Sequence, residues 1–424
     1  MMTIHLLLVV LYGQHYSNKD MNTYLEKHNY AIDLLRALTM AMMLMVNDFW
    51  SVNDIPHWME HAAWGEDMLG FSDIVFPSFL FCVGLSIPYA IAAMRRKGKT
   101  DGDVIRHILE RSFALILMGA FICNYEAGID PTIGYDSNFY CLLMTLAFFL
   151  VFTYYKSQSP MIRWLKIAGW AILLFLLITS RSPEGNTFYP YWWGILGLIG
   201  WAYLFCALVF ALVIKVSTIV IVWFLLFAVC LCCSETASYS FLQGSPILAL
   251  EGDNIVNLTL STLHIGNASS HLLVMSGVLF SALILRKIED KNMKSKTLTI
   301  LGLALLCYVI GAASHQLFIT SKLIGTLPWI FYTLAIDLIL YISFDWLVKT
   351  DKSKYLSFLN PAGTATLTCY MVPYVLYPLI SMTIGWSWSH AIPDALGIVK
   401  CLCFSGLCIA ITWALGKAGI KLKV

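Results

Sequence analysis

Apolar residues gather along the chain in twelve stretches, each long enough to cross a membrane as a helix. A bilayer core of about 30 Å needs roughly 20 apolar residues, because an α-helix rises about 1.5 Å per residue. The stretches begin near residues 31, 72, 106, 138, 162, 192, 216, 271, 297, 326, 361 and 394. This pattern predicts an all-α fold, a polytopic membrane helix bundle of about twelve transmembrane helices.

The apolar stretches form one predicted membrane domain over residues 31–416. The longest interruption, residues 234–270, is partly apolar and too short for a soluble domain. Residues 1–30 and 417–424 are predicted to be cytoplasmic tails. The apolar patch at Ile4–Tyr12 is too short to span and follows no basic region, so it does not predict a signal peptide, and Met21 is an alternative start of the chain.

The distribution of Lys and Arg predicts the orientation, because loops that face the cytoplasm carry most of these residues. With a cytoplasmic amino terminus, 22 of the 27 Lys and Arg residues fall on the inside. Three fall on the outside: Arg181, Lys322 and Lys400. We therefore expect an even number of spans and both termini in the cytoplasm.

Composition excludes an ordinary soluble protein. Hydrophobic residues make up 59% of the chain, charged residues 12%, and the mean hydropathy is +0.74. The net charge of +2 is too small to predict a nucleic-acid surface. Metal-ligand spacings, phosphate-binding glycine loops and nucleophile elbows are absent from the sequence, so no metal is expected. The lipid bilayer is the expected partner, and assembly as a homodimer is left open.

The densest group of titratable residues lies in the predicted outer loop between the first two spans. This loop contains His57 and His61, and Asp73 follows at the head of the second span. A carboxylate beside a histidine fixes the tautomer of the imidazole and stabilises the imidazolium, so His61 with Asp73 predicts a catalytic base. The alternative is an interfacial belt of histidine and aromatic side chains.

The first span has one polar face. Asp33, Arg36 and Asn47 lie at helical spacings along it, over a length of ~21 Å. Because ionisable groups inside a span normally face a cavity, Arg36 and Asn47 predict a pathway through the protein. The alternative is that Asp33 and Arg36 only anchor the helix at the membrane surface, and Arg111 in the third span has the same default interpretation.

Two further candidates lie on the predicted outer side, where basic residues are scarce. His315 ends the ninth span, and Lys322 follows in the short loop after it. Both are on the same predicted side as His61. We expect them to contact the substrate there.

Four segments share the order and spacing of polar residues found in one known family: Asp33-Leu-Leu-Arg36, Met43-Leu-Met-Val-Asn47, His61-Ala-Ala-Trp64 and Ser72-Asp73-Ile-Val-Phe-Pro77. They resemble motifs of the heparan-alpha-glucosaminide N-acetyltransferase family of transmembrane acetyltransferases, and particularly its compact bacterial relatives. The resemblance to bacterial proteins implies a location in a bacterial inner membrane. Weaker similarity occurs at Arg111 and over Thr320–Trp329.

The resemblance implies transfer of an acetyl group from cytosolic acetyl-CoA, across the membrane, to an amine on a sugar. It implies His61 as the active histidine with Asn47 and Asp73 as its neighbours. Arg36 and Arg111 are expected to bind the donor. The residues expected at the acceptor are Trp64, His315 and Lys322. Two other functions stay open: a sugar transporter with a proton-coupled gate made by His61 and Asp73, and a carbohydrate O-acetyltransferase.

Overall fold

The computed structural model describes residues 28–155, 159–213, 216–232, 267–288, 291–385 and 394–423. Over these residues the regular structure is helical apart from two isolated β-bridges. The prediction of an all-α fold is therefore confirmed for the described part of the chain. The predicted amino-terminal tail before His28, with the alternative start at Met21, lies outside the described residues.

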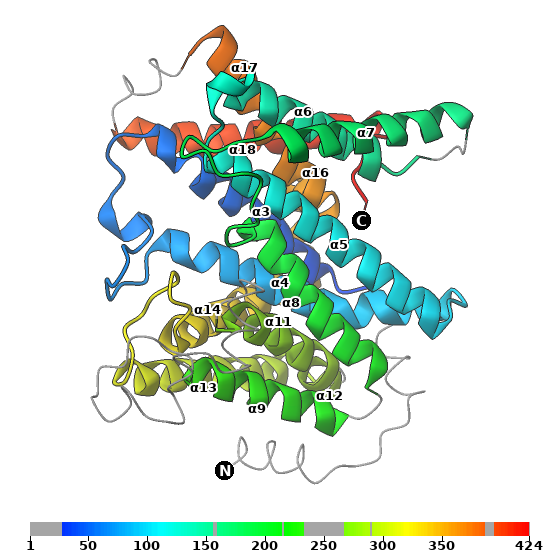
Figure 1. Ribbon diagram of the computed structural model, residues 1–424. Coiled ribbons are helices and arrows are strands. Elements are labelled where there is room, and N and C mark those ends of the chain that lie inside the picture. Colours follow the sequence, from blue (N-terminus) through cyan, green and yellow to red (C-terminus); the bar gives the residue numbers. More distant parts are fainter. Residues whose placement is uncertain are drawn as a thin grey trace. The chain divides into compact units, whose positions relative to one another are not determined.

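The helices are drawn in chain order by colour in Figure 1. Their bounds are α3 (Tyr30–Asn47), α4 (Phe71–Arg96), α5 (Asp101–Glu126), α6 (Ser137–Phe152), α7 (Pro160–Thr179), α8 (Gly194–Leu212), α9 (Val216–Cys232), α11 (Ser269–Leu279), α12 (Arg286–Ile288), α13 (Met293–His315), α14 (Leu327–Lys349), α15 (Asn360–Thr364), α16 (Thr366–Met371), α17 (Pro373–Thr383) and α18 (Asp394–Lys417). Shorter turns are η1 (Phe49–Ser51), η2 (His57–Met59), the π-helical η4 (Phe280–Leu285) and η5 (Ser353–Leu359).

Each of the twelve predicted stretches coincides with helix. Within the described residues, nine helices are long and apolar enough to cross a membrane, and the pair 353–364 and 366–383, bent by 75°, counts as a tenth if it is one span. The remaining two stretches coincide with α6 and α9, which are apolar but shorter. The chain is therefore a multi-pass membrane protein, whereas the count of twelve crossings and the side of the termini stay predictions.

The contacts group the chain into two compact units. The first comprises the described residues within 28–35, 58–112 and 199–354, and the second comprises those within 36–57, 113–198 and 355–423. The division falls within α3, α5 and α8. The predicted bounds of a single membrane domain, residues 31–416, stay a prediction.

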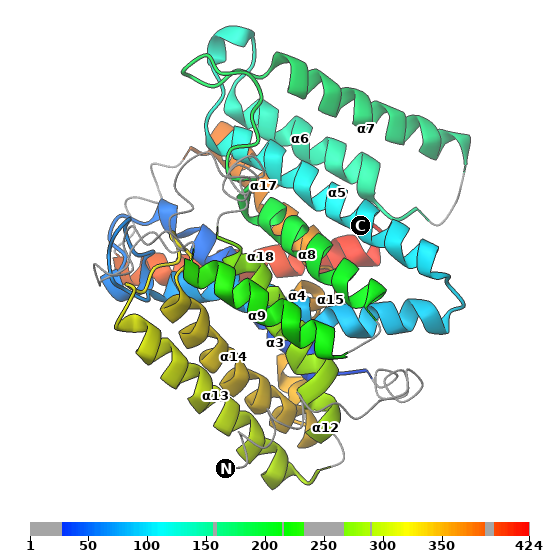
Figure 2. The same ribbon diagram turned by 60° about the horizontal axis from the view of Figure 1, so that its bottom comes forward.

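In the first unit, α4 packs against α11, and α13 runs beside α14 in both views of the ribbon (Figures 1 and 2). Two glycines let α4 and α11 approach each other. A Cβ atom at Gly84 would lie 2.0 Å from the carbonyl oxygen of Val274, and one at Gly277 would lie 2.3 Å from that of Phe81. Small residues allow this backbone-to-backbone packing in membranes. Within the first unit, α4 also contacts α14 and η4.

In the second unit, α6 packs against α7 and α17, and α18 packs against α15 and α16. The bend between α15 and α16 falls at Ala365, whose backbone leaves the helical region (φ −126°, ψ 44°). Pro361 is the second residue of α15, and Pro373 is the first residue of α17. Because the chain bends after α15, this short helix packs against α18 in a direction different from that of α16 and α17.

Candidate active site

Asp73 lies at the centre of a hydrogen-bonded group in the first unit. Its side chain is in the first turn of α4 and only 1% of the residue is exposed. One carboxylate oxygen lies 2.7 Å from Nδ1 of His61, and the other accepts hydrogen bonds from the backbone N–H groups of Ala62 (2.9 Å) and Gly70 (3.3 Å). Since an ionised carboxylate only accepts, the imidazole proton is on Nδ1, and Nε2 carries the free lone pair.

The loop that carries His61 is held close to the start of α4. Gly70 caps α4, and a Cβ atom at this position would lie 2.0 Å from the carbonyl oxygen of Glu60. The hydroxyl of Ser72 donates to the carbonyl oxygen of Met59. Only a glycine fits at position 70, so the loop can close over Asp73 and shield the carboxylate from solvent.

A proline inside α4 gives the site a second support. Pro77 has no N–H group, so the carbonyl of Asp73, four residues earlier, loses its helical partner. The indole N–H of the buried Trp329 donates to this carbonyl oxygen at 2.9 Å. The first turn of α4 is thus tied to α14 at the residue that binds His61.

Lys322 contributes a positive charge. Its Nζ atom lies 3.3 Å from Nδ1 of His61. Burial lowers the pKa of Lys322 to about 8, although the carboxylate of Asp73 acts in the opposite direction. The structure therefore brings together two residues 261 positions apart in the chain, a histidine and a lysine whose pKa lies below that of an ordinary lysine.

His315 has a partner other than His61. Its Nε2 atom lies 2.8 Å from Asp67, which also accepts a hydrogen bond from the backbone N–H of Thr320 at 2.7 Å. Partial burial would raise the pKa of Asp67, but the hydrogen bonds from Thr320 and His315 outweigh it and lower the pKa below the usual 3.8. These contacts join the His61 loop to the loop that carries Lys322, and a contact of His315 with the acceptor stays a prediction.

Two other predicted site residues, Trp64 and Arg111, lie in the first unit and differ in solvent exposure. Trp64 is in the His61 loop and is 68% exposed. The half-buried guanidinium of Arg111 lies over the ring of Tyr203, 4.9 Å from its centroid, and its Nε atom has no hydrogen-bond partner among the described residues. Arg111 is thus held by an aromatic ring, and its role in donor binding stays a prediction.

Arg36 and Asn47 belong to the second unit. Nε of Arg36 donates to the carbonyl oxygen of Gly363 at 2.9 Å. Asn47 lies within hydrogen-bonding range of the hydroxyl of Tyr370, which is 3.4 Å from that of Tyr374. The predicted position of Asn47 beside His61 stays a prediction.

Sequence reasoning missed a buried ion pair next to Asn47. Asp48 is 1% exposed, and one of its oxygens lies 3.3 Å from Nζ of Lys400, which also contacts the hydroxyl of Ser51. The hydroxyl of Tyr377 donates to the other oxygen at 3.3 Å. Lys400 is one of only three basic residues on the predicted outer side, and this scarcity could have indicated a partner for Asp48.

Comparison with known proteins covers the same region of the chain. Residues 29–130 match the family described as heparan-alpha-glucosaminide N-acetyltransferase, catalytic. Over 104 residues, the chain is 30% identical to heparan-alpha-glucosaminide N-acetyltransferase of Mus musculus. This match covers 24% of this chain and 14% of the mouse protein. The Homo sapiens protein is 30% identical over 105 residues, with the same shares.

The matched part is thus a small fraction of these curated relatives. It contains all four motif segments, including His61 and Asp73 with their hydrogen bond. Through residues 29–130, the chain is therefore related to the heparan-alpha-glucosaminide N-acetyltransferase family, as its motifs predicted.

Proposed function

We propose that the protein is a membrane-embedded acetyltransferase. It moves an acetyl group from cytosolic acetyl-CoA to the amine of an amino sugar or related glycan on the periplasmic or lumenal side. The observation that carries the proposal is the pair formed by His61 and Asp73. The buried carboxylate binds the Nδ1–H group and leaves Nε2 free to act as a base or a nucleophile.

The proposed chemistry breaks the C–S bond of the thioester and forms a C–N bond. In one route, Nε2 of His61 takes a proton from the bound ammonium, and the amine attacks the thioester carbonyl. That proton passes to the departing CoA thiolate, and the nitrogen then loses its second proton to Nε2, which releases it to solvent. In the other route, Nε2 attacks the thioester, and CoA leaves as the thiolate, which takes up a proton from solvent. The acceptor ammonium gives a proton to solvent, the amine takes the acetyl group from the imidazole, and its nitrogen loses its second proton to the ring nitrogen that is set free. In both routes Asp73 stabilises the positive charge that the imidazole acquires.

The remaining proposed roles belong to cationic, polar and aromatic residues that the sequence singles out. Arg36 and Arg111 bind the phosphates of the donor, since guanidinium groups suit phosphate oxygens. Asn47 donates a hydrogen bond to the oxyanion that develops on the thioester carbonyl. Trp64 and Lys322 lie in the same unit as His61 and contact the acceptor. These roles rest on the resemblance as well as on the charges.

Transfer of labelled acetyl from acetyl-CoA to glucosamine by the purified protein tests the proposal. We expect His61→Ala to lower transfer at least about a thousandfold while acetyl-CoA binding stays within about twofold. Asp73→Asn should lower the rate of acetyl transfer at least about a hundredfold, because the amide no longer selects the Nδ1–H tautomer of His61. His57→Ala is the matched control, since His57 is exposed and lies four residues upstream, and it should transfer normally.

The outcomes separate the rival functions. Arg36→Ala should weaken acetyl-CoA binding with His61 intact, and equal loss of binding in the Arg36 and His61 variants would make His61 a structural residue. Ester products would identify an O-acetyltransferase. If vesicles accumulate the sugar and no acetyl group is transferred, the protein is a transporter. Labelled acetyl found on His61 without acceptor, by mass spectrometry, would select the acetyl-imidazole route.

A further inference from the structure

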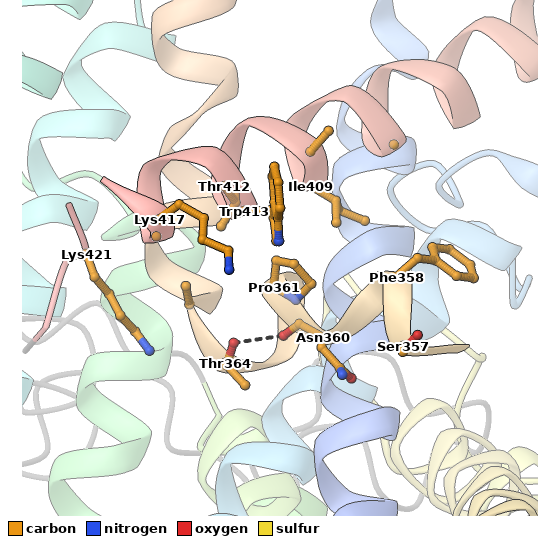
Figure 3. A pocket seen from close by; sticks show the side chains of 14 residues that line it. Ser357, Phe358, Asn360, Pro361, Thr364, Ile409, Thr412, Trp413, Lys417 and Lys421 are labelled. Atoms are coloured by element: carbon orange, nitrogen blue, oxygen red, sulfur yellow. Dashed lines mark hydrogen bonds between the residues drawn. The ribbon is translucent and has the colours of Figure 1, made fainter. Parts of the chain in front are cut away.

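An open cavity lies in the second unit, where η5 and α15 face the carboxyl-terminal half of α18. Its volume is about 910 Å³, within the range of about 300–1,000 Å³ typical of ligand sites. Figure 3 shows Lys417 and Lys421 at one end of this cavity and Phe358 at the other, with Trp413 between them. The cavity therefore has a cationic end and an apolar end.

Positive charge accumulates at the cationic end. None of the described side chains that line the cavity is acidic. Partial burial, together with the nearby charges of Lys423 and Arg36, lowers the pKa of Lys421. Arg36 itself binds the carbonyl oxygen of Gly363 in α15. An anion at this end would meet the two lysines that line it, Lys417 and Lys421, and no carboxylate among the described lining residues competes with them.

The rest of the cavity suits a hydrocarbon chain. Ile409 and Phe358 line the end away from the lysines, and Gly406 has nothing within 4 Å of an added Cβ atom. Only 28% of the most apolar part of α18 is buried within the protein, so this helix has a large surface that lipid can contact. A ligand here can keep its apolar part in the bilayer while its charged part reaches the lysines.

We propose that the cavity between α15 and α18 binds an anionic phospholipid. The phosphate lies between Lys417 and Lys421, and one acyl chain lies beside Ile409 and Phe358. Basic pockets between membrane helices bind anionic headgroups in this way, above all on the cytoplasmic side. The predicted orientation places the carboxyl-terminal end of α18 on that side. The site does not depend on acetyl transfer.

Native mass spectrometry of the purified protein can measure this binding with palmitoyl-oleoyl phosphatidylglycerol, and with phosphatidylcholine of the same chains. We expect phosphatidylglycerol to bind at least tenfold more tightly. The double substitution Lys417→Gln with Lys421→Gln should remove this preference. Lys423→Gln is the matched control, since Lys423 lies over the ring of Tyr154, 4.8 Å from its centroid, and does not line the cavity. Equal binding of the two lipids, or a preference that survives the double substitution, would overturn the proposal.

A second pair of variants tests the apolar end without changing any charge. Gly406→Leu places a side chain in the cavity and should weaken phosphatidylglycerol binding at least fivefold. Gly302→Leu adds the same side chain to α13, where nothing lies within 4 Å, and should leave binding unchanged. Unaltered binding in Gly406→Leu would contradict the cavity as the site. If free CoA displaces the lipid, and does so only with both lysines present, the occupant is the donor nucleotide instead.

Discussion

Two side chains of opposite charge approach the same ring nitrogen of His61. Asp73 binds Nδ1 at 2.7 Å and Nζ of Lys322 lies 3.3 Å from the same atom. The carboxylate is buried at the start of a helix, whereas the lysine reaches the site from a loop. The aspartate therefore determines which ring nitrogen is protonated. The lysine places a second ionisable group beside that nitrogen.

The pKa of Lys322 leads to a prediction for the pH dependence of transfer. Because burial lowers this pKa to about 8, Lys322 is mostly charged at neutral pH and loses its proton as the pH rises through 8. Lys322→Arg stays charged throughout this range. We expect the ratio of kcat/KM in the native protein to that in the variant to fall about tenfold per pH unit above that pKa.

The measurement is a pH–rate profile of both proteins with glucosamine as the acceptor. Taking the ratio removes the titration of the acceptor amine, which both proteins share. A ratio that stays constant through the alkaline range would assign no role in transfer to the charge of Lys322.

At the scale of elements, α4 combines a break in its hydrogen bonds with a support from α14. Pro77 deprives the carbonyl of Asp73 of a helical partner, and Trp329 replaces that partner. A buried acceptor left without a donor destabilises a protein by about 1–3 kcal/mol. The proline and the tryptophan should therefore be coupled in their effects on stability.

Trp329→Phe removes the indole N–H group and should lower the free energy of unfolding by about 1–3 kcal/mol. In a protein that already carries Pro77→Ala, Trp329→Phe should lower the free energy of unfolding by less. The N–H group of the alanine can donate to the carbonyl of Asp73 in place of the indole. Denaturant unfolding in detergent micelles measures this double-mutant cycle. Trp164→Phe is the control, since Trp164 is 68% exposed. Strictly additive effects would show that Trp329 does not replace the missing helical bond.

The contact between α4 and α11 leads to a second prediction for stability. A Cβ atom at Gly84 would lie 2.0 Å from a backbone oxygen of α11, which no side-chain movement can relieve. Gly84→Ala should therefore destabilise the protein by at least about 1–3 kcal/mol. Gly302→Ala should be neutral or stabilising, because its Cβ meets open space and alanine favours helix. Thermal unfolding compares the two, and similar melting temperatures would contradict close packing of α4 on α11.

At the scale of the whole molecule, the distribution of basic residues predicts the topology. Four Lys and Arg residues surround Gly98, whereas Arg181 alone lies near Gly185. The positive-inside rule therefore places Gly98 in the cytoplasm and Gly185 outside. Alkaline phosphatase fused after Gly185 or after Gly65, in the His61 loop, should be active, since its disulfides form only outside the cytoplasm. A fusion after Gly98 should be inactive, and the reverse pattern would invert the topology.

The sequence by itself indicated the class of the protein and the family to which residues 29–130 are similar. The apolar stretches predict membrane helices because length and hydropathy are local properties. Over the described residues, nine of the predicted spans are helices long and apolar enough to cross a membrane. The pairing of His61 with Asp73 was also predictable, since only a loop and one helical turn separate them. Their catalytic roles, like the roles of Asn47 and Arg36, stay predictions.

Only the tertiary structure decided which distant side chains meet. The contacts of Lys322 with His61, of Trp329 with the carbonyl of Asp73, and of Lys400 with Asp48 each join residues more than 250 positions apart. Hydropathy predicts that a segment lies in the membrane, but not which face it presents to which neighbour. That choice depends on close packing between helices, as at Gly84 and Gly277, and on the need of buried polar groups for partners.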